Sequence, residues 1–158
     1  MAKTFKDLIA EILPDITEVF PWDVEEILES NPSAILVDTR EQDEFDALHI
    51  KGSLFVPRGI LEACCDWGYA ETIPELAAAR NKQVIVICRS GNRSALAAMV
   101  MQIMGYENVT SMKTGIKGWN DSDYPLHDKE GNTVDPDWAD GFLNPLIRKE
   151  QQAEEQVE

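Results

Sequence analysis

Two short apolar runs, residues 34–37 (AILV) and 84–87 (VIVI), restrict this chain to few architectures. Neither run alternates apolar with polar residues, as a strand with one face in water would. The second run consists only of β-branched residues, which favour strands over helices. Both runs therefore predict strands of a parallel sheet that is covered on its two faces.

Segments with helical patterns separate these strands from three shorter strand patterns. We expect strands over residues 16–20, 34–37, 53–56, 84–87 and 109–112. We expect helices over residues 4–12, 22–30, 41–48, 59–67, 73–79, 94–104 and 115–120. The helix over residues 94–104 is apolar on nearly every face, which predicts that it is buried. Strands that alternate with helices predict an α/β fold with a mainly parallel central sheet flanked by helices.

The composition divides the chain into three parts. Residues 1–13 predict an N-terminal helix, residues 14–122 the compact α/β domain, and residues 123–158 an acidic C-terminal extension. The polar end of this extension, residues 150–158, is expected to be disordered. Five large apolar residues precede that end: Trp138, Phe142, Leu143, Leu146 and Ile147. We expect them to dock on the chain's own domain, with a dimer or partner contact as the alternative.

The charge of the chain argues against some classes of partner. The chain has 14 Lys and Arg against 29 Asp and Glu, a formal net charge of −15. Such a surface repels nucleic acid and anionic membranes. No apolar run approaches the roughly 20 residues of a membrane helix, and the N-terminus lacks the apolar segment of a secretory signal. We therefore expect a cytoplasmic protein with neither nucleic acid nor a membrane as partner.

The cysteines and histidines indicate neither a disulfide framework nor a metal site. Cys64, Cys65 and Cys88 are few and odd in number, and no CxxC pair is present. His49 and His127 stand far apart in the chain, so we expect no metal and no cofactor. We expect His49 to fix a turn through backbone hydrogen bonds rather than act as a base. Cys64 and Cys65 predict buried core residues, the alternative being that one passes sulfur to Cys88 or forms a disulfide with it.

The segment 88–94 (CRSGNRS) joins the second apolar strand to the apolar helix. Loops at the carboxyl ends of parallel strands bind ligands, and the N-terminus of the following helix favours anions. Gly91 and Asn92 can adopt positive φ, which lets successive N–H groups converge on an anion. These surroundings favour the thiolate of Cys88, which is the nucleophilic form. The loop thus predicts a nucleophilic cysteine, the alternative being an ordinary buried one.

The loop and several further motifs resemble the single-domain rhodanese family. These motifs are VDTRE at residues 37–41, EF at 44–45, HIKGS at 49–53, VP at 56–57 and GIKGW at 115–119. Lys51 stands where the family often has proline, and Thr114 where it often has glycine. The resemblance implies a three-layer rhodanese-like domain over residues 14–122. Related phosphatases have one residue more between cysteine and arginine than the four between Cys88 and Arg93.

The resemblance also implies a two-step sulfur transfer through a persulfide on Cys88. The thiolate attacks the outer sulfur of a small donor anion such as thiosulfate, and a thiol or cyanide-like acceptor then removes that sulfur. The implied anion-binding residues are Arg89, Ser90, Gly91, Asn92 and Arg93. Their backbone N–H groups would hold the terminal sulfur, while the two arginines would bind or steer the donor's sulfonate end.

Three residues are expected to support the loop: Asp38, Arg40 and Ser94. Asp38 follows the first apolar strand and so lies near the same sheet edge as the loop. We expect it to fix the loop, with a role in proton transfer as the alternative. Arg40 is expected to form an ion pair with Glu41 or Glu44.

Three other functions stay open at this point. One is a persulfide carrier or interaction module that delivers sulfur to a partner protein through the C-terminal extension. A cysteine-dependent phosphatase or arsenate reductase is disfavoured by the short loop and by the lack of an evident general-acid loop. A catalytically inactive relative is disfavoured because Cys88 is present.

Overall fold

The computed structural model describes residues 1–153 and is built around one sheet. Five strands lie in the order β1-β5-β4-β2-β3, and all their pairings are parallel. The strands are β1 (Glu18–Val19), β2 (Ile35–Asp38), β3 (Leu54–Phe55), β4 (Gln83–Ile87) and β5 (Asn108–Met112). The predicted α/β fold with a parallel central sheet is confirmed, and β4 occupies the middle of that sheet.

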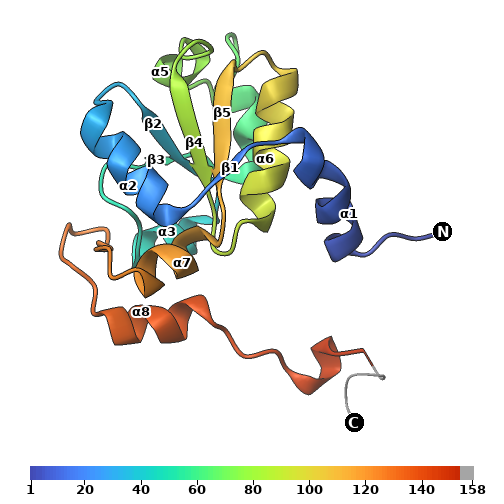
Figure 1. The fold of residues 1–158 in the computed structure, drawn as a ribbon, viewed down its shortest axis with the longest axis vertical. Helices are drawn as coiled ribbons and strands as arrows, with labels where there is room; N and C mark the ends of the chain where they lie inside the picture. Colours follow the sequence, from blue (N-terminus) through green and yellow to red (C-terminus); the bar gives the residue numbers. More distant parts are fainter. Residues whose placement is uncertain (154–158) are drawn as a thin grey trace.

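Helices cover both faces of the sheet, which gives the molecule three layers (Figure 1). The helices of residues 1–153 are α1 (Phe5–Ile12), α2 (Pro21–Ser30), α3 (Gln42–Ala47), α4 (Leu61–Cys64), α5 (Pro74–Ala77), α6 (Asn92–Ile103), α7 (Gly115–Asp121) and α8 (Pro136–Leu143). Shorter 3-10 turns span Leu13–Asp15, Arg58–Ile60 and Lys149–Gln151.

The apolar residues of β4 contribute to the hydrophobic clusters on both faces of the sheet. Val84 and Val86 pack into a cluster with residues of α4, α5 and α6 on one face of the sheet. Ile85 and Ile87 pack into a second cluster with residues of α2, α7 and α8 on the other face. Successive side chains of a strand point to opposite faces, so a strand buried on both faces must be apolar throughout.

Two predicted helices are shorter than expected. The helix predicted over residues 59–67 is a 3-10 turn, Arg58–Ile60, followed by the four residues of α4. The helix predicted over residues 73–79 is reduced to α5. The chain leaves α4 because the N–H group of Ile73, rather than a helical donor, binds the Cys64 carbonyl at 3.1 Å.

The helix after β4 begins two residues earlier than predicted, at Asn92. Asn92 and Arg93 therefore belong to the first turn of α6 and not to the loop. Helix α6 is buried at Ala97 and Met101, but its last residue, Ile103, is 76% exposed. The prediction that this helix is buried was thus wrong for its last residue.

The C-terminal extension docks on the domain through part of its length. The side chain of Asp135 accepts a hydrogen bond from the Trp138 N–H group at 3.0 Å, and this cap begins α8. Leu143 is buried in the core shared with α7, but Trp138, Leu146 and Ile147 are exposed. The expected docking is therefore correct for Leu143 and for Phe142, which packs partly buried against the same core. It is wrong for Leu146 and Ile147, because the chain leaves the core after α8, and for Trp138, which stacks on Phe142 and is 53% exposed.

The described part of the extension ends after a 3-10 turn. Residues Lys149–Gln151 form a 3-10 turn, and the prediction of disorder for residues 154–158 lies outside the described residues. Among the helices of residues 1–153, none has the length and apolar character needed to cross a membrane.

Candidate active site

The candidate nucleophile, Cys88, lies directly after the central strand β4. Its Sγ accepts hydrogen bonds from the backbone N–H groups of Gly91, at 3.1 Å, and Ser94, at 3.3 Å. The Ser94 hydroxyl lies 3.4 Å from Sγ and 2.7 Å from the Ser111 hydroxyl. The thiol is 1% exposed, so these contacts replace the water that would otherwise solvate a thiolate. Ser94 thus supports the sulfur directly.

Four further amides, two in the loop and two in the first turn of α6, are available to an anion. The N–H groups of Arg89, Ser90, Asn92 and Arg93 have no hydrogen-bond partner within residues 1–153. Gly91, with φ of 101°, turns the chain between them, and the last two amides belong to the first turn of α6. The positive end of the α6 dipole adds to the attraction for negative charge. Residues 89–94 therefore provide two N–H groups that contact the sulfur and four that have no partner within residues 1–153.

Helix α7 holds the carbonyl groups of the loop away from this set of N–H groups. The Ile116 N–H group binds the Cys88 carbonyl at 2.9 Å, and the Lys117 N–H group binds the Arg89 carbonyl at 3.0 Å. The close approach requires Gly115, which has φ of 64° and whose added Cβ would lie 2.6 Å from the Cys88 carbonyl oxygen. The sequence motif GIKGW contained this glycine, but its role in orienting the loop was not predicted.

Asp38 and Arg40 form a fully buried ion pair beside the loop. Arg40 Nε donates to Asp38 Oδ1 at 3.0 Å and Arg40 Nη2 to Oδ2 at 2.9 Å, and both side chains are 0% exposed. Nη2 also donates to the Leu48 carbonyl at 2.6 Å. The prediction that Arg40 pairs with Glu41 or Glu44 was wrong. Asp38 is instead its partner, because the Arg40 side chain turns back under the end of β2.

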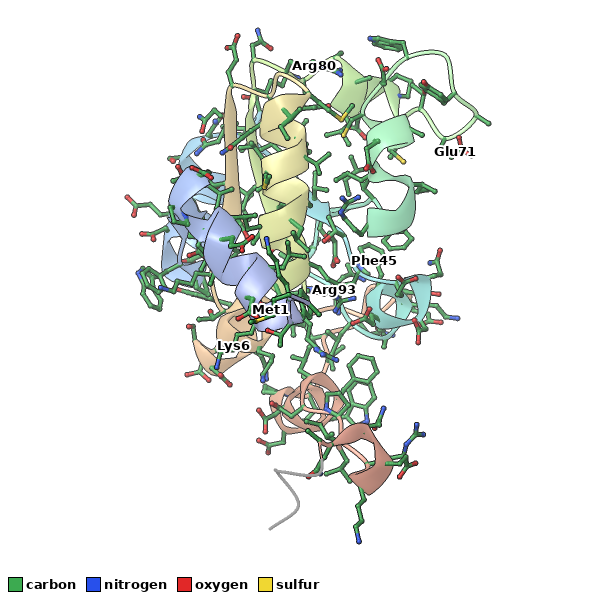
Figure 2. All side chains as sticks on the ribbon, turned by 90° about the vertical axis from the view of Figure 1, so that its right-hand side faces the viewer. Met1, Lys6, Phe45, Glu71, Arg80 and Arg93 are labelled. Carbon is green, nitrogen blue, oxygen red and sulfur yellow. The ribbon has the colours of Figure 1, made fainter. Side chains whose placement is uncertain are left out.

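Arg93 is paired with Glu44 in the structure. Its two terminal nitrogens donate to the two carboxylate oxygens at 2.8 and 2.9 Å. In Figure 2, Arg93 lies on the side of α6 that faces α3, the helix of Phe45. The pairing raises the pKa of Arg93. It leaves Arg89 as the loop arginine that forms no ion pair within the described part of the chain.

The pKa of Glu44 reports the strength of this pair. Burial raises the pKa of the carboxyl, but the hydrogen bonds from Arg93 and the Glu41 amide and the nearby positive charges outweigh burial, so the pKa lies below its ordinary value. A carboxyl whose folded pKa is lowered stabilises the fold fully above its unfolded pKa, about 4.3, and loses this contribution as the pH falls through the folded value.

We therefore expect Glu44→Gln to be less stable than the wild type at pH 7 and to approach it near pH 3. The loss at pH 7 is expected to be about 1 kcal/mol, because both side chains keep contact with solvent. Denaturant unfolding between pH 3 and pH 7 measures the difference. Glu11→Gln is the control, since the Lys3–Glu11 pair is half exposed. A difference for Glu44→Gln that is constant over this range contradicts the prediction.

Cys64 and Cys65 are buried at the other end of α6 from Cys88. Cys65 lies near Arg80, whose Nε donates to the carbonyl of Met104, the residue that follows α6. Arg80 and Arg93 lie at opposite ends of α6 (Figure 2). A helix of 12 residues is about 18 Å long. Burial raises the pKa of both thiols. The structure thus supports two core residues and excludes a disulfide between either of them and Cys88 in this conformation.

The double substitution Cys64→Ala/Cys65→Ala is expected to leave the sulfur chemistry of the protein unchanged. The mass of the intact protein, measured after incubation with a sulfur donor, should increase by one sulfur atom in both the double variant and the wild type. The expectation is contradicted if the wild type gains two or more sulfur atoms and the double variant gains only one.

His49 acts as a structural residue, as its motif predicts. Its Nδ1 lies 2.8 Å from the Phe45 carbonyl, and its ring stacks on that of Phe45. Its backbone pairs with that of His127 through two hydrogen bonds of 2.8 and 2.9 Å. The pair ties the segment after α3 to the C-terminal extension. Within residues 1–153, no group of three His, Cys, Asp or Glu side chains is placed to hold a metal ion.

The family model described as the rhodanese-like domain matches residues 21–122, from α2 to the end of α7. The sulfur carrier relative YrkF of Bacillus subtilis is 31% identical over 111 residues, which cover 70% of this chain and 52% of that protein. The thiosulfate sulfurtransferase GlpE of Tolumonas auensis is 30% identical over 90 residues, covering 56% of this chain and 74% of that protein. The chain spans about half or less of the length of the first curated relatives it matches.

A solved structure extends the similarity beyond the sequence motifs. It is a Rhodopseudomonas palustris protein of unknown function, suggested to be a tyrosine phosphatase, with 28% identity and a TM-score of 0.71. The alignment covers 80% of this chain and 96% of that one. The loop geometry, the parallel sheet and the matched family model agree, and this chain belongs to the rhodanese-like family of sulfurtransferases.

Proposed function

We propose that this protein transfers sulfane sulfur through a persulfide on Cys88. The thiolate attacks the outer sulfur of a donor anion such as thiosulfate, a new S–S bond forms, and the donor's S–S bond breaks to release sulfite. The persulfide anion then gives its outer sulfur to a nucleophile, which is a thiol or cyanide, and the Cys88 thiolate is regenerated.

The observation that carries this proposal is the pair of backbone N–H groups that contact Sγ, together with four neighbouring N–H groups that have no partner within residues 1–153. The contacting groups are those of Gly91 and Ser94. A second sulfur atom bonded to Sγ extends the anion toward such donors, which act on it as an oxyanion hole acts on oxygen. Arg89, which forms no ion pair within residues 1–153, would attract the donor in a protein of net charge −15.

Delivery of sulfur to a partner protein is the second candidate function. The YrkF relative, which is named a sulfur carrier, favours it. The exposed side chains of Trp138, Leu146 and Ile147 in the C-terminal extension provide a surface for a protein acceptor. The two functions share the Cys88 persulfide and differ only in the acceptor. A variant without the exposed apolar residues of the extension distinguishes the two functions. If it still turns over thiosulfate but no longer delivers sulfur to a protein, delivery depends on this surface.

Phosphatase chemistry fits the loop less well. Four residues separate Cys88 from Arg93, one fewer than in the related phosphatases, so the loop is narrow for a phosphoryl group. Arg93, which would have to clamp such a group, is held by both oxygens of Glu44. A tyrosine phosphatase activity is suggested for the Rhodopseudomonas palustris protein. An assay with an aryl phosphate tests whether this protein has that activity.

The test is the mass of the intact protein before and after thiosulfate, with cyanide added last. We expect a gain of one sulfur atom, its loss on addition of cyanide, and one thiocyanate released per protein molecule. An unchanged mass together with hydrolysis of an aryl phosphate would falsify the proposal. An unchanged mass with thiosulfate but a gain of sulfur with another donor would correct the identity of the donor alone.

A further inference from the structure

The hydroxyl group of Ser111 lies near the candidate nucleophile, and the transfer chemistry described so far does not use it. Its oxygen is 2.7 Å from the Ser94 hydroxyl, which is itself 3.4 Å from Cys88 Sγ. The three side chains are at most 1% exposed, so bulk water does not compete with these contacts. The two hydroxyl groups thus form a short buried chain that ends at the sulfur.

Strand β5 fixes the position of Ser111. The residue pairs with Val86 of β4, and its N–H group binds the Thr17 carbonyl at 3.0 Å. Val109, two residues earlier, belongs to the same core cluster as Ala97 of α6, and side chains two residues apart on a strand point to the same face. The Ser111 side chain therefore faces α6 from a strand that has neighbours on both sides (Figure 1).

The number of available partners fixes the direction of the hydrogen bonds in this chain. Within residues 1–153, the Ser111 hydroxyl has Ser94 as its one hydrogen-bond partner, and the geometry of that contact allows either hydroxyl to donate. A thiolate on Cys88 has no proton and only accepts. Ser111 then donates to Ser94, Ser94 donates to Sγ, and both hydroxyl protons have an acceptor. The opposite direction would leave the buried Ser111 proton without an acceptor.

The contact with Ser111 is needed because a serine hydroxyl rotates. Ser94 belongs to the first turn of α6, and a serine in a helix can instead turn its hydroxyl to a backbone carbonyl of the preceding turn. The Ser111 hydroxyl binds the Ser94 oxygen in the orientation that directs the Ser94 proton at Sγ. A hydroxyl group that accepts one hydrogen bond is also a stronger donor of the next.

We propose that Ser111 is a positioning residue that acts through the Ser94 hydroxyl to stabilise negative charge on Sγ when the persulfide is discharged. The inference rests on the proposed function, since it assigns a residue to the second step of that transfer. In the persulfide anion the charge lies on the outer sulfur, and Sγ is neutral. The acceptor attacks the outer sulfur, the S–S bond breaks, and its electron pair returns to Sγ. The hydrogen bond from Ser94 therefore strengthens during discharge.

The loading step gains little from the same hydroxyl chain. Charge leaves Sγ in that step, so a hydrogen bond to Sγ makes the thiolate a weaker nucleophile. The same hydrogen bond favours the ionised form of Cys88, which is the reactive one, and the two effects oppose each other. Loss of Ser111 is therefore expected to slow discharge and to leave loading nearly unchanged. This difference separates the proposed role from general support of the fold.

Single-turnover rates of the two steps test the assignment on the full chain. Loading is followed by intact mass after addition of thiosulfate, and discharge by release of thiocyanate when the loaded protein is mixed with cyanide. We expect Ser111→Ala to slow discharge about fivefold and to change loading by less than about twofold. Ser111→Thr, which keeps the hydroxyl, should discharge within about twofold of the wild-type rate. The matched control is Thr110→Val, which should change neither rate, since the buried Thr110 hydroxyl has no hydrogen-bond partner within residues 1–153.

A double-mutant cycle distinguishes action through Ser94 from a loss of packing. If Ser111 acts through Ser94, Ser111→Ala should slow discharge no further in a Ser94→Ala background. The inference is overturned if the effect of Ser111→Ala persists in that background, or if this variant slows both steps alike or neither of them. It is also overturned if Ser111→Thr unfolds at the wild-type temperature but discharges as slowly as Ser111→Ala.

A spectroscopic measurement tests the hydroxyl chain independently of turnover. The ultraviolet absorbance of the Cys88 thiolate, with Cys88→Ser as the blank, should appear at higher pH in Ser111→Ala than in the wild type. In Thr110→Val it should appear at the wild-type pH. Equal absorbance curves for Ser111→Ala and the wild type overturn the inference. Failure of the wild type to gain sulfur from any donor refutes the proposed function, and the absorbance curves then still decide whether Ser111 stabilises charge on Sγ.

Discussion

Replacing Cys88 by serine is expected to abolish the gain of sulfur and to lower sulfur transfer by roughly three orders of magnitude or more. A serine hydroxyl has nearly the size of the thiol and can accept the N–H groups of Gly91 and Ser94. It is scarcely ionised near neutral pH and forms no persulfide, so the nucleophile is lost while the loop is kept. Thiocyanate formation and intact mass measure the two effects.

The thermal unfolding of the same variant provides the control. Since the buried contacts of the cysteine are preserved, we expect the midpoint of Cys88→Ser to stay within a few degrees of the wild-type value. Loss of sulfur transfer in a protein that unfolds normally then reflects chemistry and not folding. Substantial sulfur transfer by Cys88→Ser would show that another cysteine carries the persulfide. Adding Cys64→Ala/Cys65→Ala to this variant would test whether that cysteine is Cys64 or Cys65.

The sheet and the candidate nucleophile could be predicted because each depends on a pattern of a few consecutive residues. The run VIVI permits little else than a buried strand, and the residues that follow such a strand must lie at its carboxyl end. This reasoning predicted the position of Cys88, and in the structure Cys88 directly follows the central strand β4. Which carboxylate each arginine contacts depends instead on tertiary geometry.

The ion pairs show the limit of local reasoning. Asp38, Glu41 and Glu44 all stand within four residues of Arg40, and spacing alone does not choose among them. In the folded chain Arg40 pairs with Asp38, while Glu44 pairs with Arg93, which is 49 residues away.

The sequence also contains a pattern that predicts the start of α8. Asp-Pro at residues 135–136 is a helix start, and the apolar residues that follow have helical spacing.

Asp38→Asn is expected to destabilise the protein by about 3–5 kcal/mol, the largest loss of stability among the substitutions considered. The substitution keeps the shape of the side chain but removes the negative charge. The Arg40 guanidinium then stays fully buried with no counter-charge in contact, since both partners are 0% exposed. Such a loss lowers the unfolding midpoint by roughly 10 °C in a domain of this size. Urea unfolding at pH 7 measures it.

The exposed pair of Arg58 and Glu62 is the matched control for this buried one. Its side chains are 30% and 55% exposed, so Glu62→Gln should cost less than about 1 kcal/mol. Equal losses for Asp38→Asn and Glu62→Gln would show that burial does not amplify the cost.

The Asp38→Asn variant also separates the two roles considered for Asp38, support of the loop and proton transfer. If Asp38 only supports the loop, Asp38→Asn assayed well below its midpoint keeps the wild-type pH profile of persulfide formation, whereas a displaced profile assigns the carboxylate a part in proton transfer.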